Sequence, residues 1–100
     1  MRAVDSLSAL QQWYADQCNG DWEHQFGVDI GTLDNPGWSL SIDLTGTPLE
    51  NKVFAEMSDL THESNWIHCK VKKQKFEGRC GPRNLERLIS IFLQWASQSS

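Results

Sequence analysis

Two stretches in which apolar and polar residues alternate, separated by a turn sequence, constrain the fold of this chain most strongly. From Trp22 to Ile30, the residues at every second position are apolar apart from one histidine, and the same period returns from Trp38 to Leu44. A period of two is typical of a strand with one buried face. Asp34-Asn35-Pro36-Gly37 lies between the stretches and has turn chemistry, so the sequence predicts an antiparallel hairpin.

The register of this hairpin follows from residue parity. Both apolar sets are even-numbered, so burying both on one face requires facing residues whose numbers sum to an even value. The expected pairs are Ile30 with Leu40 and Val28 with Ile42. This register requires either a loop of odd length, such as 33–37, or a bulge at Gly31, and we favour the bulge.

A helix is predicted near each end of the chain. Ser6 serves as the N-cap of the first, its apolar residues recur at helical spacing up to Cys18, and Gly20 marks its end. Asn84 can cap the second helix, whose apolar residues cover a very wide arc. That arc consists of Leu85, Leu88, Ile89, Ile91, Phe92, Leu93, Trp95 and Ala96. A helix of this composition must be largely buried.

Two more strands complete the expected sheet. A weak strand is predicted over residues 53–57, a polar loop over 58–65, and a fourth strand over 66–74. The fold class is therefore α+β, with two layers: a four-stranded antiparallel sheet with the N- and C-terminal helices packed on one face and solvent on the other. One hundred residues are expected to form a single domain, residues 1–100.

The charge of the chain is distributed unevenly. Residues 1–65 hold eleven acidic and two basic side chains, a balance of −9, whereas residues 66–100 hold seven basic and two acidic ones, a balance of +5. Such asymmetry can steer a charged partner, and it argues against general nucleic-acid binding unless the basic segment acts alone.

The sequence also indicates the cellular compartment of the protein. No stretch is long and apolar enough to span a membrane, and the N-terminal residues lack the apolar region of a secretory signal. The three cysteines, Cys18, Cys69 and Cys80, form no C-x-x-C pair, and an odd number favours free thiols over a disulfide framework. We therefore expect a cytoplasmic protein that does not interact with membranes.

The segment Asp21-Trp22-Glu23-His24 has the composition of an active site but the wrong geometry for one. In the predicted strand, Asp21 and Glu23 point to the open face, and Trp22 and His24 point toward the helices. Acid–base catalysis by two carboxylates usually needs one in an apolar setting that raises its pKa, whereas both are expected in water. The histidines and cysteines have no spacing typical of metal ligands. We expect no catalytic residues, no metal and no cofactor.

A thiol-dependent small enzyme is an alternative hypothesis. Cys80 lies in a Gly- and Arg-rich loop, between Arg79 and Arg83 and before a helix, a setting that can lower a thiol pKa and bind anions. The phosphatase spacing, with arginine six residues after the cysteine, fails because Glu86 occupies that position. We favour a turn between strand and helix in which Cys80 has no chemical role.

Distinctive strings of residues cover nearly the whole chain, from Leu10 to Ala96. They are LQQWYADQCNGDWEHQFGVDIGTLDNPGWSLSIDLTGTPLE and GPRNLERLISIFLQWA, with particular marks at residues 13–14, 20–24, 27, 32–38, 42–44 and 81–82. These strings resemble the Immunity protein 53 family of bacterial polymorphic toxin systems. The resemblance implies an α+β protein, encoded beside a toxin gene, that binds and neutralises its cognate toxin in the cytoplasm without a catalytic step.

An acidic sheet face is the expected binding surface. The candidate partner-binding residues are Asp21, Glu23, Asp29, Asp34 and Asp43. A toxin that attacks nucleic acid, such as a nuclease, usually presents a basic cleft, which an acidic face could occupy as a substrate mimic. The expected partner is therefore the toxin and not nucleic acid.

Three alternatives remain open. The acidic residues could instead hold turns and strand ends, with binding through the basic segment 70–83 or the loop 58–65. The protein could also be a generic adaptor that binds several proteins. The oligomeric state is open as well, because an edge strand could pair two copies.

Overall fold

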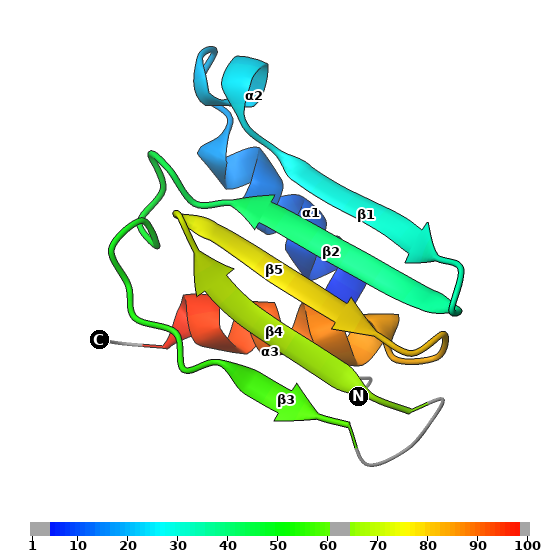
Figure 1. Cartoon of the computed structure of the whole chain (residues 1–100). Helices are drawn as coiled ribbons and strands as arrows, with labels where there is room; N and C mark the ends of the chain where they lie inside the picture. The colour runs from blue at the N-terminus through cyan, green and yellow to red at the C-terminus, as the bar shows by residue number, and fades with distance from the viewer. Residues whose placement is uncertain (1–4, 61–64, 99–100) are drawn as a thin grey trace.

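Five antiparallel strands form one sheet, and two longer helices pack against it (Figure 1). The computed structural model describes residues 5–60 and 65–98. Its elements are α1 (Ser6–Gln17), α2 (Trp22–Gln25), β1 (Val28–Leu33), β2 (Gly37–Asp43), β3 (Met57–Asp59), β4 (Ile67–Lys72), β5 (Lys75–Cys80) and α3 (Leu85–Ser97). The sheet order is β1-β2-β5-β4-β3. The predicted α+β class and the position of the terminal helices are confirmed, but the sheet has five strands rather than four.

The strand that the sequence did not predict, β5, lies at the centre of the sheet. The chain turns at Lys73 and Gln74 and returns, instead of continuing one strand to residue 74. Both turn residues have positive φ values, 54° and 61°, as a two-residue hairpin turn of the primed type requires. Neither residue is the glycine, asparagine or aspartate that usually marks such a turn, so the turn left no signal in the sequence.

The register of the first hairpin is confirmed. Ile30 faces Leu40 and Val28 faces Ile42. The pairing continues without interruption to the last pair of the ladder, Leu33 with Gly37, so the bulge expected at Gly31 is wrong. The three-residue loop 34–36 between the paired residues Leu33 and Gly37 satisfies the parity condition without a bulge. The alternative of an odd-length loop is therefore the one that the structure adopts.

Residues 22–25 form a helical turn, α2, and not the start of the first strand. The side-chain oxygen of Asn19 accepts hydrogen bonds from the backbone N–H groups of Asp21 and Trp22, at 3.0 and 2.9 Å. The Glu23 carboxylate accepts from the N–H groups of Asn19 and Gly20, at 2.9 and 2.8 Å. Local bonds of this kind compete with strand pairing, and here they fold the chain back on itself.

Two helix caps and one strand differ in detail from the prediction. Asp5 rather than Ser6 caps α1, because its carboxylate accepts the N–H of Leu7 at 3.1 Å. Asn84 occupies the N-cap position of α3, but its side-chain amide donates to the carbonyl of Trp66 at 3.1 Å. The weak third strand is β3, which starts at residue 57 rather than 53; of the predicted 58–65 loop, residues 61–64 lie outside the described part.

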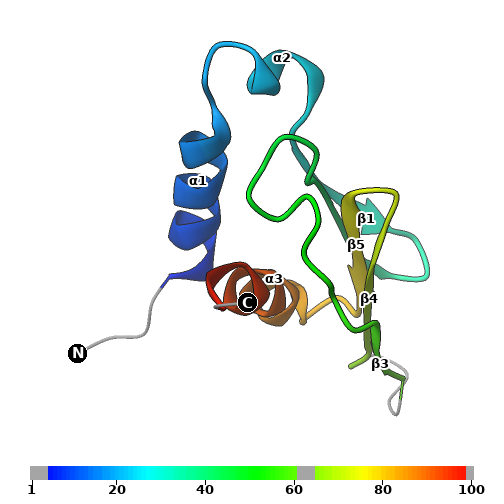
Figure 2. The same ribbon diagram turned by 90° about the vertical axis from the view of Figure 1, so that its left-hand side faces the viewer.

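The core lies between α3 and the central strands. α3 buries Leu88, Ile89, Phe92 and Trp95, as its wide apolar arc predicts. The ring of Phe92 lies 5.1 Å from that of Phe76 on β5 and 5.1 Å from that of Trp13 on α1. Figure 2 shows α1 and α3 on the same side of the sheet. Phe92 therefore joins both helices to the middle of the sheet.

Close approach of α3 to β5 depends on the glycine at position 78. A Cβ atom there would lie 2.5 Å from Cδ1 and 3.1 Å from Cγ of Leu88, whose side chain is fully buried. We expect Gly78→Ala to destabilise the protein by about 1–3 kcal/mol, because the extra methyl group overpacks this contact. Urea unfolding measures the change.

Gly31→Ala is the matched control, because the added Cβ would only approach the Ser39 hydroxyl, at 3.3 Å, on the side of the sheet away from the helices. Equal losses of stability in the two variants would contradict the close contact between α3 and β5.

Candidate partner-binding surface

The face of the sheet that points away from α1 and α3, hereafter the open face, carries no described helix (Figure 2). Its residues follow from the register, since Leu40, Ile42 and Phe76 alternate with them and are buried on the helix side. The open face comprises Asp29, Gly31, Ser39, Ser41, Asp43, His68, Lys70, Lys72, Lys75, Glu77 and Arg79. Short residues occupy its β1–β2 part, so an approaching partner would reach the sheet closely there.

Charge divides the open face along the strands. β1 and β2 contribute Asp29 and Asp43, whereas β4 and β5 contribute three lysines, one arginine and Glu77. The prediction of an acidic face did not anticipate this division, because the missed strand β5 places the basic half of the chain directly beside β2. The open face is acidic on one side and basic on the other.

Asp29 and Asp43 lie on this face in different states. Asp29 is exposed, and it faces Ser41 across the β1–β2 ladder. Asp43 accepts the N–H of Gly27 through Oδ2 at 2.9 Å, and its Oδ1 lies 3.4 Å from the Lys75 ammonium. Asp43 therefore fixes the start of the hairpin, while Asp29 is available to a partner.

Asp21 and Glu23 are not on the open face, because they belong to the α2 turn. Glu23 is half-buried, and the N–H groups that its carboxylate binds lower its pKa, namely its own backbone N–H and those of Asn19 and Gly20. Asp21 is exposed and makes no side-chain capping bond to α2. Next to them, Trp22 is buried as predicted, but His24 is exposed and does not point into the core.

Asp34 is exposed in the loop between β1 and β2, at the opposite end of β1 from α2. The five predicted acidic residues thus do not form one cluster. They follow the first hairpin and the turn that precedes it, and only Asp29 and Asp43 share the open face.

The basic side of the open face was not expected from the sequence, which predicted an acidic face. Lys70, Lys72, Lys73, Lys75 and Glu77 line a shallow hollow of about 470 Å³ at the β4–β5 hairpin. Further along β4, Nε2 of His68 lies 2.8 Å from the Glu56 carboxylate, a hydrogen bond that lowers the pKa of Glu56. The segment 70–83 was a competing candidate surface, and most of its charges lie on this face.

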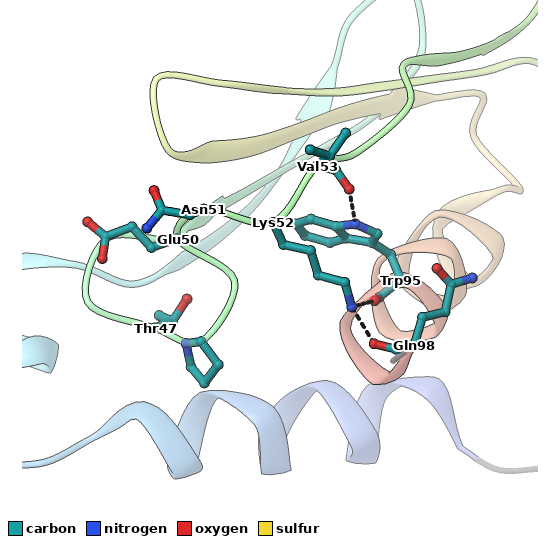
Figure 3. Close-up of a pocket in the computed structure, with 8 residues that line it drawn as sticks. Thr47, Glu50, Asn51, Lys52, Val53, Trp95 and Gln98 are labelled. Carbon is teal, nitrogen blue, oxygen red and sulfur yellow. Dashed lines mark hydrogen bonds between the residues drawn. The ribbon is translucent and has the colours of Figure 1, made fainter. Parts of the chain in front are cut away.

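A larger hollow, of about 640 Å³, lies between the segment 47–53 and the end of α3 (Figure 3). The Lys52 ammonium in it donates to the carbonyl oxygens of Trp95, at 2.7 Å, and Gln98. A cation at this position satisfies the free carbonyls of the helix end and opposes the negative end of the helix dipole. Trp95 in turn donates its indole N–H to the carbonyl of Val53 at 2.8 Å. The polar groups here close the helix end and have structural roles.

The two buried thiols, Cys69 and Cys80, lack the setting of a reactive site. Cys80 is fully buried on the helix side of β5, and burial raises its pKa, an effect that outweighs a hydrogen bond from the backbone of Trp38. Burial raises the pKa of Cys69 to about 11. Both shifts keep the thiols protonated, whereas a nucleophilic cysteine needs a lowered pKa and access. Cys80 lies within a strand and not in the predicted loop.

Residues 5–60 and 65–98 contain no group of three histidine, cysteine, aspartate or glutamate side chains that could hold a metal ion. Within the same ranges, no helix has the length and apolarity needed to cross a membrane.

A family model described as Immunity protein 53 matches residues 7–97. The chain belongs to the Immunity protein 53 family. The resemblance identified from residues 10–96 is therefore confirmed. No curated protein and no solved structure matches the chain. Membership in an immunity protein family implies a toxin as partner and toxin neutralisation as the role, and such proteins are typically binders without enzymatic activity.

Several residues that mark the Immunity protein 53 resemblance contact one another. The Asp43 N–H donates to the Gly27 carbonyl at 3.0 Å, which complements the side-chain bond in the opposite direction. The Trp38 indole donates to the Pro82 carbonyl at 3.0 Å. These contacts join distant parts of the chain, so these marks have structural roles.

Trp22, another mark of the Immunity protein 53 resemblance, anchors the α2 turn. Its indole N–H donates to the Thr45 carbonyl at 2.8 Å, and its ring lies 6.3 Å from that of Trp13 and 5.9 Å from that of Tyr14 on α1. Edge-to-face contacts of this kind stabilise aromatic clusters. The position of the acidic turn therefore depends on a buried tryptophan.

We expect Glu23→Gln to destabilise the folded protein at neutral pH. The folded pKa of Glu23 is lowered, so its carboxylate contributes stability above the unfolded pKa of about 4.3, and this contribution disappears as the pH falls through the folded pKa. Urea unfolding at neutral and at acidic pH should show a difference between wild type and variant that shrinks in acid.

Asp21→Asn is the control, because it removes the same charge from the same turn without removing a capping bond. A difference between Glu23→Gln and wild type that stays constant with pH would contradict the role of the ionised carboxylate.

Proposed function

We propose that this protein binds a cognate bacterial toxin in the cytoplasm and neutralises it by occupying the toxin surface, without a catalytic step. The observation that carries the proposal is the match of the Immunity protein 53 model to residues 7–97. Three cysteines without a disulfide partner fit a reducing compartment. The two buried thiols, with raised pKa values, offer no support for the thiol-dependent alternative.

The acidic residues of the α2 turn and the first hairpin form the proposed partner-binding segment. The set is Asp21, Glu23, Asp29, Asp34 and Asp43. Asp21, Asp29 and Asp34 are exposed, and within the described ranges no ion pair engages them. Glu23 and Asp43 bind backbone N–H groups of their own chain. In this proposal the three exposed carboxylates meet the toxin, and the other two position the segments that carry them.

Electrostatic attraction is the proposed means of recognition. Carboxylates along one edge of the molecule would face basic groups of the toxin, such as those of a nuclease cleft. Exposed charges of this kind raise the association rate and the specificity more than the affinity, and salt screens them over about 8–10 Å. The short side chains beside Asp29, at Gly31 and Ser41, leave room for a basic side chain to approach.

Charge reversal at Asp29 and Asp34 tests this surface. We expect the double variant Asp29→Lys/Asp34→Lys to lower the association rate with the toxin encoded beside the gene about ten- to a hundredfold at low salt. The loss should shrink as salt is added. Surface plasmon resonance across a salt series measures both effects, and thermal unfolding should show that the variant is folded.

Glu86→Lys is the control, because it reverses one carboxylate at an exposed site on α3, on the helix side of the sheet, and so makes the charge change of either single replacement, Asp29→Lys or Asp34→Lys. If Glu86→Lys slowed association as much as the double variant, or if the double variant bound as fast as wild type, the acidic surface would be wrong. If the wild-type protein did not bind the toxin, the proposed function as a whole would be wrong.

A further inference from the structure

The outer edge of β1 is open for pairing with another strand. β1 lies at one end of the sheet, and β2 is the only strand of residues 5–60 and 65–98 that pairs with it. The N–H of Asp43 donates to the carbonyl of Gly27, so in this ladder the odd-numbered residues of β1 hydrogen-bond to β2. The backbone groups of Val28, Ile30 and Thr32 consequently point outward, away from β2.

This edge lacks the features that usually prevent strands from pairing with other molecules. Edge strands are commonly short, bulged, or protected by lysine or proline. β1 has six residues and an uninterrupted register, and it contains neither lysine nor proline. Its charged residue, Asp29, points to the open face rather than outward along the sheet. The opposite edge strand, β3, has only three residues.

An apolar groove of about 300 Å³ runs beside this edge on the helix side. It is formed by Leu7, Leu10, Gln11 and Tyr14 of α1 with Gly27, Val28 and Ile30. Leu7, Tyr14 and Ile30 are 54%, 38% and 40% exposed, which is high for large apolar side chains. Among the described residues, only two other large apolar side chains are exposed, Val53 and Leu60, so three of these five side chains gather at one site.

We propose that a second copy of the chain pairs with this edge, β1 against β1 in antiparallel orientation, to form a symmetric dimer with one continuous sheet. The two-fold axis passes between the two Ile30 residues. Val28 of one copy then faces Thr32 of the other, and Asp29 faces Gly31. The outward backbone groups of the even-numbered residues make the hydrogen bonds, and the same patch is used on both copies, as two-fold symmetry requires.

The chemistry of the patch matches itself. Asp29 faces a glycine and not a second Asp29, so no like charges stand directly opposite each other. Each Ile30 side chain lies on the helix side of the sheet and would cover the groove of the other copy, where Leu7 and Tyr14 are exposed. The dimer leaves the open face uncovered. Dimer formation is therefore independent of the proposed toxin contacts, which Asp29 and Asp34 make through their side chains.

Light scattering of the purified full chain over a concentration series tests the proposal. We expect the mass to rise from that of one chain, 11.4 kDa, to twice that value. Ile30→Lys should weaken self-association by at least about tenfold, because it places two positive charges opposite each other in place of an apolar contact. Val53→Lys is the matched control: Val53 is 87% exposed and lies beside Trp95 of α3, whose indole donates to its carbonyl, and not on the β1 edge, so the Val53→Lys variant should dimerise as wild type does.

Covalent trapping provides a test that does not depend on a loss of function. In a Cys18→Ser background, Ile30→Cys should form a disulfide-linked dimer on mild oxidation, because facing residues of paired strands lie about 5.5 Å apart at Cα, within disulfide range. Val53→Cys should not. A single-chain mass at all concentrations, with no more crosslinking at position 30 than at 53, would overturn the proposal. If added toxin then protected the Ile30→Cys thiol from alkylation, the edge would belong to a strand of the toxin.

Discussion

The packing of α3 on β5 organises the fold. β5 lies at the centre of the sheet, and Phe76 on it meets Phe92 and Trp95 on α3 at ring distances of 5.1 and 6.4 Å. Gly78 lets the helix approach, and Phe92 extends the cluster to α1. Because the aromatic side chains bury the largest areas in the core, this cluster determines which side of the sheet is dry. The other side carries the charged side chains of the open face, of which Asp29 is exposed.

In the α2 turn, a buried aromatic residue and charged residues are neighbours in the sequence because each has a separate role in holding the turn. In the α2 turn, Trp22 anchors to α1 and to the Thr45 carbonyl, while Glu23 ties the turn to residues 19 and 20. Gly27 and Asp43 exchange two hydrogen bonds at the start of the hairpin. These residues hold the acidic segment in one shape. A preorganised surface loses less entropy on binding, which would favour the proposed contact of this segment with the toxin.

The sequence predicted the parts of the fold in which side-chain alternation or helical periodicity is unbroken. The Val28–Ile42 register, the burial of Trp95 and Phe92, and the location of Asp29 followed from parity and the apolar arc. Prediction from the sequence failed where local turn geometry determines the path of the chain. The Lys73-Gln74 turn lacks the usual residues, so β5 was missed, and with it the basic side of the open face.

The α2 turn is the second failure, and it changed the candidate site. Residues 22–30 alternate as a strand would, but backbone N–H groups that donate to the side chains of Asn19 and Glu23 fold the first part into a helical turn. These bonds have no periodic signature. As a result Asp21 and Glu23 lie beside the sheet rather than on it, and the five acidic residues follow the hairpin instead of forming one face.

In the proposed mechanism the protein neutralises its toxin by occupying the toxin surface, so inhibition should be stoichiometric and not catalytic. Titrating a fixed amount of the toxin encoded beside the gene with increasing amounts of this protein, and measuring the remaining toxin activity, tests that claim most directly. We expect the activity to fall in proportion to the protein added and to reach background at an equimolar end-point that does not change with incubation time. Progressive inactivation by substoichiometric protein, or full toxin activity in the presence of an excess, would contradict it.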